Sequence, residues 1–79
     1  MFRTLVNTQE IELAGQVYSV GYYEEQTLRG TRRYSAELVV GPADRIIVDA
    51  GSLTDLELKV ARLAPATIYS RMLAARAAA

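Results

Sequence analysis

The 79-residue sequence contains no cysteine and no histidine. Without cysteine there are no disulfide bonds and no thiolate chemistry, and the two absences together remove the usual ligands of zinc, haem iron and iron–sulfur clusters. Histidine is also the side chain that most often performs general acid–base catalysis near neutral pH. The sequence therefore predicts a non-enzymatic protein with no catalytic residues, no cofactor and no metal centre.

The chain also lacks a net charge and a long hydrophobic run. Nine basic and nine acidic residues cancel, so no overall field draws the chain toward nucleic acid. No apolar stretch approaches the roughly 20 residues that a membrane-spanning helix needs, and the largely polar residues 7–12 stand where a secretion signal would be hydrophobic. We expect a cytoplasmic protein without membrane contacts. Because eight of the nine basic residues are arginine, a GC-rich bacterial or phage genome is favoured.

The short length limits the hydrophobic core. A chain of this size forms one domain, residues 1–79, and buries only about 60% of the surface that it exposes when unfolded. Small domains without disulfides or metals are commonly stabilised by a partner subunit. We therefore expect the chain to form a homodimer or to dock on a larger protein.

Alternating apolar and polar residues predict an antiparallel sheet in the first fifty residues. The alternation favours strands over residues 10–13, 16–23, 33–40 and 45–50. Ala14-Gly15 separates the first two runs as a tight hairpin turn, and residues 41–44 form a second turn because they contain Gly, Pro and Asp. Short connections favour a meander of consecutive neighbours.

Helical spacing begins after Gly51, where Ser52 can cap the helix. Leu56 and Val60 lie on its apolar face together with Leu53, Leu63 and Ala64. Pro65 disfavours a straight continuation, so the helix is expected to kink or split there. The predicted fold class is α+β: a three- to four-stranded antiparallel meander followed by a carboxy-terminal helix, kinked or split at Pro65 and packed on one sheet face.

Two carboxylates offer the best candidates for a metal site. Asp44 and Asp49 flank the last predicted strand, and oxygen ligands alone can hold Mg²⁺ or Ca²⁺. Their spacing matches no known motif, and the isolated glycines form no phosphate-binding loop. A carboxylate-based metal-binding protein or enzyme is thus the least favoured of three functional hypotheses.

A polar connection at residues 24–33 has acids where the chain enters and bases where it leaves. Glu24 and Glu25 are expected to form cross-strand ion pairs with Arg32 and Arg33. The alternative is a projecting basic finger. In that interpretation Arg29, Arg32 and Arg33 contact phosphates, and the protein is a nucleic-acid-binding accessory domain. The neutral net charge disfavours this second hypothesis.

The favoured hypothesis is a protein-binding module with no small-molecule ligand. Tyr23, Val39 and Ile47 share the sheet face opposite the core and form a candidate apolar strip there. Tyr69 and Met72 share one side of the second helical stretch, which either completes the core layer or reaches toward a partner. Together with the three arginines, these residues are the candidate partner-binding positions.

Overall fold

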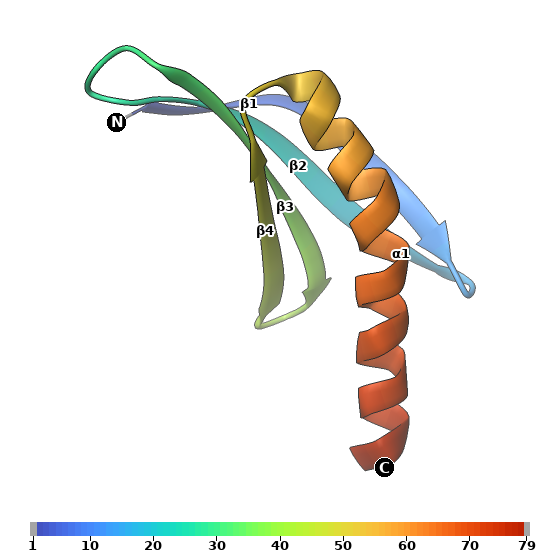
Figure 1. Cartoon of the computed structure of the whole chain (residues 1–79). Coiled ribbons are helices and arrows are strands. Elements are labelled where there is room, and N and C mark those ends of the chain that lie inside the picture. Colours follow the sequence, from blue (N-terminus) through green and yellow to red (C-terminus); the bar gives the residue numbers. More distant parts are fainter. Residues whose placement is uncertain (1, 79) are drawn as a thin grey trace.

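The computed structural model describes residues 2–78 of the chain. Four strands precede one helix (Figure 1): β1 (Phe2–Leu13), β2 (Gln16–Gln26), β3 (Arg32–Gly41), β4 (Asp44–Ala50) and α1 (Leu53–Ala78). The strands form one antiparallel sheet in the order β1-β2-β3-β4, and α1 packs on one of its faces. This architecture confirms the predicted meander followed by a carboxy-terminal helix.

Strand β1 is much longer than predicted, because it begins at Phe2 rather than at Glu10. Its pairing with β2 shifts register between Leu5 and Asn7. Leu5 pairs with Tyr23, whereas Asn7 pairs with Tyr22, so the strand changes phase at this irregularity and its side chains exchange faces. The strand therefore has no single alternating pattern along its whole length. For this reason the sequence pattern did not predict its first half.

Positive φ angles occur at the two turns that bound β2. Ala14 and Gly15 have φ angles of 53° and 79°, and two consecutive positive values suit the tight hairpin that was predicted there. At the other end, the N–H of Thr27 donates to the carbonyl of Thr31 at 3.0 Å, and Gly30 has a φ of 81°. The β2–β3 connection is thus a closed turn rather than a long flexible loop.

The core lies between α1 and the inner face of the sheet. On α1, every fourth residue is buried: Leu56, Val60, Ala64 and Ile68. The sheet contributes Tyr18, Val20, Tyr22, Ala36, Leu38 and Ala50. The helix begins as predicted, since the N–H of Asp55 donates to Oγ of Ser52 at 3.2 Å and satisfies one of the free donors of the first turn.

Pro65 neither splits nor ends the helix, so of the predicted kink or split, the split does not occur. A single α-helix runs through it from Leu53 to Ala78. Proline cannot donate a hydrogen bond to the carbonyl four residues earlier, which here belongs to Ala61. Both Ala61 and Pro65 are exposed, so water can reach that carbonyl and the missing bond is tolerated.

The molecule is elongated because its two hairpins diverge. In Figure 1 the β1–β2 turn and the β3–β4 turn lie on opposite sides of α1, and the helix continues past both. Arg71 anchors it to the β3–β4 turn through an Nε–Oδ2 bond of 2.6 Å to Asp44. The extents are 47 × 21 × 15 Å, and the radius of gyration is 13.9 Å, against about 11.6 Å for a compact chain of this length.

Candidate functional site

The two flanks of α1 are filled to different degrees. Beside the middle of the helix, the space toward β3 and β4 has a volume of about 10 Å³ and is lined by apolar side chains such as Val48 and Leu63. A hollow of about 490 Å³ opens on the same flank only where α1 begins, beside the end of β4. Between the helix and β1, two open hollows have volumes of about 300 and 680 Å³. They follow one another along both elements, and we name them together the β1 groove.

The part of the β1 groove beside the first turns of α1, its upper part, is polar. Its lining residues are Asn7, Thr8, Gln9, Ile11, Tyr22, Glu57, Val60 and Ala61. The Tyr22 hydroxyl donates to Oε1 of Gln9 at 2.6 Å. Burial of the ring, reinforced by the negative charge of Glu57, raises the pKa of Tyr22 above its ordinary value. The tyrosine therefore stays protonated, and this part of the groove offers hydrogen-bonding groups.

The lower part of the β1 groove is apolar. It is lined by Leu13, Ala14, Pro65, Ala66, Tyr69, Met72 and Arg76. Of the two helix residues predicted to bind a partner, Met72 is half-buried against the core, whereas Tyr69 is 59% exposed. Arg76 is the one charged side chain of this lining, so the lower groove suits an apolar partner surface.

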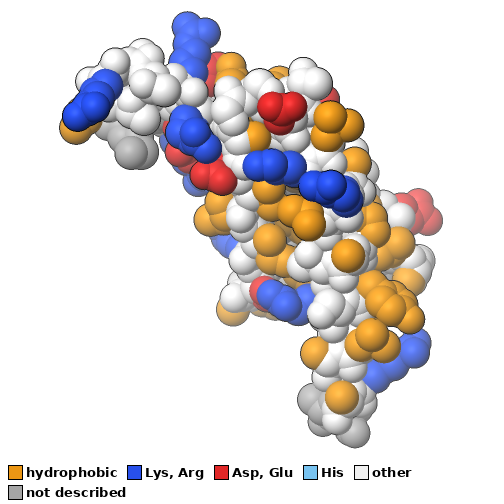
Figure 2. All heavy atoms as spheres, in the orientation of Figure 1, with side chains coloured by type: hydrophobic (Ala, Val, Ile, Leu, Met, Phe, Trp, Pro, Cys, Tyr) orange, Lys and Arg blue, Asp and Glu red, His pale blue; other side chains and the backbone are white. Residues whose placement is uncertain are grey.

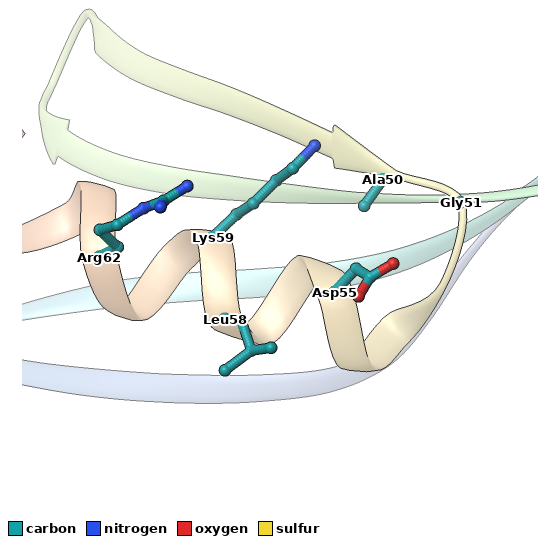
Figure 3. A pocket seen from close by; sticks show the side chains of 6 residues that line it. All are labelled: Ala50, Gly51, Asp55, Leu58, Lys59 and Arg62. Carbon is teal, nitrogen blue, oxygen red and sulfur yellow. The ribbon is translucent and has the colours of Figure 1, made fainter.

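The free side of α1 carries a second apolar stripe, which begins at Leu58 outside the groove lining and meets the lower groove at Pro65 and Tyr69. Leu58 is 66% exposed and points to the side of the helix opposite Lys59 and Arg62 (Figure 3). It is followed at helical spacing by Pro65 and Tyr69. In Figure 2, hydrophobic side chains follow the helix along its length, basic side chains lie across its upper half, and a further basic cluster lies beside its lower half.

The accessible surface is larger than a compact monomer of this mass should have. It measures 5635 Å², whereas the scaling of folded monomers gives about 4700 Å² for 8.7 kDa. The surplus of about 900 Å² resembles the roughly 800 Å² that each partner buries in a standard protein–protein interface.

The outer sheet face was predicted to carry an apolar strip, but arginine side chains cross it and bind a tyrosine ring and a carboxylate there. The Tyr23 ring lies against Gly21, and the Arg3 guanidinium stacks 3.7 Å above the ring centroid. Glu37 accepts hydrogen bonds from Arg3 at 3.1 Å and from Arg45 at 2.6 Å. These two arginines lower the pKa of the Glu37 carboxyl below its ordinary value.

The remaining members of that strip are separated by polar neighbours. Val39 and Ile47 do lie on the outer face and are 38% and 66% exposed. Val39 pairs across the strands with Arg45, and Ile47 pairs with Glu37. The structure thus places Tyr23, Val39 and Ile47 on one face, as predicted. It brings Tyr23 and Val39 together in an open hollow of about 390 Å³, whose lining also contains Glu37, whereas Ile47 is not part of that lining.

The arginine hairpin is ion-paired in part. Arg32 lies 3.5 Å from Glu24, as predicted, whereas Arg33 lies 3.6 Å from Asp49 instead of Glu25. Glu25 pairs with Arg3 across β1, a strand that the sequence did not reveal at that position. Arg29 sits exposed in the turn, and within residues 2–78 no ion pair involves it.

The remaining polar features do not converge on a chemical site. Asp44 and Asp49 stand near opposite ends of β4, about 17 Å apart at 3.3–3.4 Å per residue, and cannot share one ion. A hollow of about 490 Å³ between the end of β4 and the start of α1 is lined by Ala50, Gly51, Asp55, Leu58, Lys59 and Arg62 (Figure 3), so its two basic groups stand beside an acid and an apolar side chain. In the described part of the chain, no three carboxylates gather as metal ligands.

Sequence reasoning missed the β1 side of the site. Tyr69 and Met72 were identified, but Leu13, Leu58 and Pro65 were not. The available signal was the spacing of Leu58, Pro65, Tyr69 and Met72, whose steps of seven, four and three residues correspond to whole turns of one helix side. That spacing indicates a second contact face, although it does not locate the strand beside it.

Comparisons with models of protein families, with curated proteins and with solved structures find no match to this chain. Among residues 2–78, no helix combines the length and apolar character that crossing a membrane requires.

Proposed function

We propose that this protein is a non-enzymatic protein-binding module that associates through the β1 groove, either with itself or with a larger protein. The observation that carries the proposal is the surplus of about 900 Å² of accessible surface, together with the open flank of α1. The cytoplasm is the setting that we propose for this binding, as the sequence leads us to expect.

The chemistry of the β1 groove supports a protein partner over other classes. Its lower part combines Leu13, Tyr69 and Met72 with a single charge at Arg76, and aromatic residues, Met and Arg are enriched in protein interfaces. Nucleic acid needs clustered positive charge, which the groove does not have. The basic residues of the β2–β3 hairpin lie partly neutralised at the other end of the sheet.

A tagged pull-down from the source cell, followed by mass spectrometry, tests this function with two matched variants. Leu58 and Ile47 are both 66% exposed but lie on opposite surfaces, one on the free side of α1 and one on the outer sheet face. Leu58→Asp should abolish recovery of the partner, whether that is the untagged chain or another protein. Ile47→Asp should leave recovery at the wild-type level.

Two results would contradict this proposal. Recovery of no specific protein by the wild-type chain would remove the binding function itself. Loss of the partner with Ile47→Asp and not with Leu58→Asp would keep a binding function but move it to the outer face, where Tyr23 and Val39 also lie.

A further inference from the structure

From the shape and polarity of the β1 groove, we infer that it is filled by helix α1 of a second copy of this chain, with the two helices parallel and side by side. This inference rests on the proposed binding function and names its partner. The dimer that results has two helices enclosed between two sheets.

The width of the open strip fits one helix. Neighbouring strands lie 4.7–4.9 Å apart, so four strands span about 14 Å between the outer axes, whereas packed helices lie 8–10 Å apart. One helix therefore leaves room for a second at the edge of a four-stranded sheet. Here that edge is β1, whose inward residues Ile11 and Leu13 are only half-buried.

The same chain supplies both the groove and an unpaired helix surface to fill it. A symmetric dimer requires one surface to be complementary to itself. Ala61 and Pro65, one turn apart on the groove side of α1, are small enough to let a second helix approach. Leu58 and Tyr69 extend this surface above and below, with exposed fractions of 66% and 59%.

Polarity along the groove sets the direction of the second helix. The groove is polar beside the first turns of α1, at Gln9 and Glu57, and apolar beside its last turns, at Leu13. The exposed side of α1 carries Leu58 and Arg62 in its first half, and Tyr69, Leu73 and Arg76 in its second. A parallel second helix puts Arg62 near the polar part of the groove and the two large apolar residues Tyr69 and Leu73 near its apolar part at Leu13, whereas an antiparallel helix exchanges them.

The symmetry is then a two-fold axis that runs along the helices. In this arrangement each α1 packs on the sheet of its own chain, and the free side of the same helix packs against β1 of the partner copy. The surplus of about 900 Å² on one chain is close to what one side of a stable dimer interface buries. Both open surfaces of the fold are covered by this one arrangement.

Engineered cysteines test the arrangement, because the chain contains none of its own. Facing Cα atoms of helices packed 8–10 Å apart are about 3.4–5.4 Å apart, which overlaps the range that a disulfide spans. Ala61→Cys and Pro65→Cys should each convert most of the protein into a disulfide-linked dimer under mild oxidation. Ala43→Cys, in the exposed β3–β4 turn, should stay a monomer on the same gel.

Each outcome separates this inference from the proposed function. Cross-linking at both groove positions, with sedimentation showing a dimer before oxidation, supports the parallel pair. An antiparallel pair would cross-link at no more than one of the two positions and would overturn the inference. A protein that is monomeric at all concentrations overturns it as well. In that last case the proposed function survives only if the pull-down recovers a different partner that Leu58→Asp loses.

Discussion

The two flanks of α1 meet the same sheet with very different results. Toward β4 the space beside the middle of the helix is about 10 Å³, and a hollow of about 490 Å³ opens only at its first turns, whereas toward β1 hollows of about 300 and 680 Å³ follow one another along the helix. A helix is 10–12 Å wide with its side chains, which is too little to cover four strands that span about 14 Å between their outer axes. The sheet is therefore wider than the single helix that packs on it.

The difference between the flanks separates residues that stabilise the fold of one chain from residues that stay exposed and available to a partner. Leu56 is fully buried, and Leu58, two positions later, is 66% exposed. Residues two apart on a helix do not face the same way, so these two leucines report separately on the covered and open sides.

The largest expected effect comes from this pair of leucines. Leu56→Ala should lower the free energy of unfolding by about 2–5 kcal/mol, because it leaves a cavity in the core. At dilutions where the chain is a monomer, Leu58→Ala should change it by no more than about 0.5 kcal/mol. Chemical denaturation followed by circular dichroism measures both. A loss below about 0.5 kcal/mol for Leu56→Ala would mean that the covered side has been assigned to the wrong helix face.

The two prolines provide the next contrast. Pro65→Ala restores a donor for the carbonyl of Ala61 on the open flank, and proline inside a helix costs up to about 3 kcal/mol. We expect the monomer to become more stable by about 1–3 kcal/mol. Pro42→Ala, in the exposed β3–β4 turn, should instead destabilise it by about 0.4–1 kcal/mol, because the unfolded chain gains freedom. Thermal unfolding distinguishes the two signs, and a destabilising Pro65→Ala would contradict this account of the helix.

Tyr69 tests whether the open side contributes to association. Tyr69→Ala should weaken binding by about 1–2 kcal/mol, roughly 5- to 30-fold in Kd, because large aromatic residues carry much of the energy of an interface. Val17 is the matched control, since it is equally exposed at 59% but stands on the outer face of the β1–β2 hairpin. Sedimentation at several concentrations gives both constants, and equal effects would remove the distinction between the two surfaces.

The two faces of the sheet should respond to opposite ends of the pH range. Hydrogen bonds from Arg3 and Arg45 lower the pKa of Glu37, so its contribution is present above the unfolded pKa and is lost as pH falls through the lower folded value. Burial raises the pKa of Tyr22, so its contribution is present below the unfolded pKa, about 10, and is lost as pH rises through the folded value.

Unfolding curves across the pH range check these directions. Glu37→Gln should flatten the acid side of the stability profile and leave the alkaline side unchanged, and Tyr22→Phe should do the reverse. If either variant altered the opposite side of the profile, the assignment of the two groups would be wrong.

The smallest effect is expected at the arginine hairpin. Replacing Arg29, Arg32 and Arg33 with alanine should cost at most about 1 kcal/mol of stability per exposed ion pair. We also expect nucleic-acid binding no tighter than the non-specific level of roughly 10⁻⁴–10⁻⁶ M at physiological salt. Fluorescence anisotropy with duplex DNA and with RNA measures this, and nanomolar binding abolished by the triple variant would favour the nucleic-acid hypothesis.

Local patterns predicted most of the fold. The hairpin at Ala14-Gly15, the cap at Ser52 and the core positions Leu56 and Val60 each follow from rules that operate within a few residues. The first half of β1 could not be predicted in this way. It lies at a sheet edge, its side chains exchange faces near Leu5, and it is exposed at nearly every position.

The candidate site was predicted only on its helix side, because local sequence patterns do not show which strand lies beside the helix. Tyr69 and Met72 stand out by helical spacing, whereas the opposite wall at Leu13 depends on where β1 ends relative to α1. The sequence pattern also placed Tyr23 and Ile47 on one face correctly. It could not show that Arg3, from the unpredicted strand segment, would cover Tyr23.

Sedimentation equilibrium at micromolar concentration tests most directly whether the open flank of α1 is an interface. The wild-type chain and Ile47→Asp should both have twice the 8.7 kDa chain mass, and Leu58→Asp should have the mass of one chain while keeping its helical circular dichroism signal. A wild-type protein that remains a single chain at every concentration, or a Leu58→Asp variant that remains a dimer, would contradict the account.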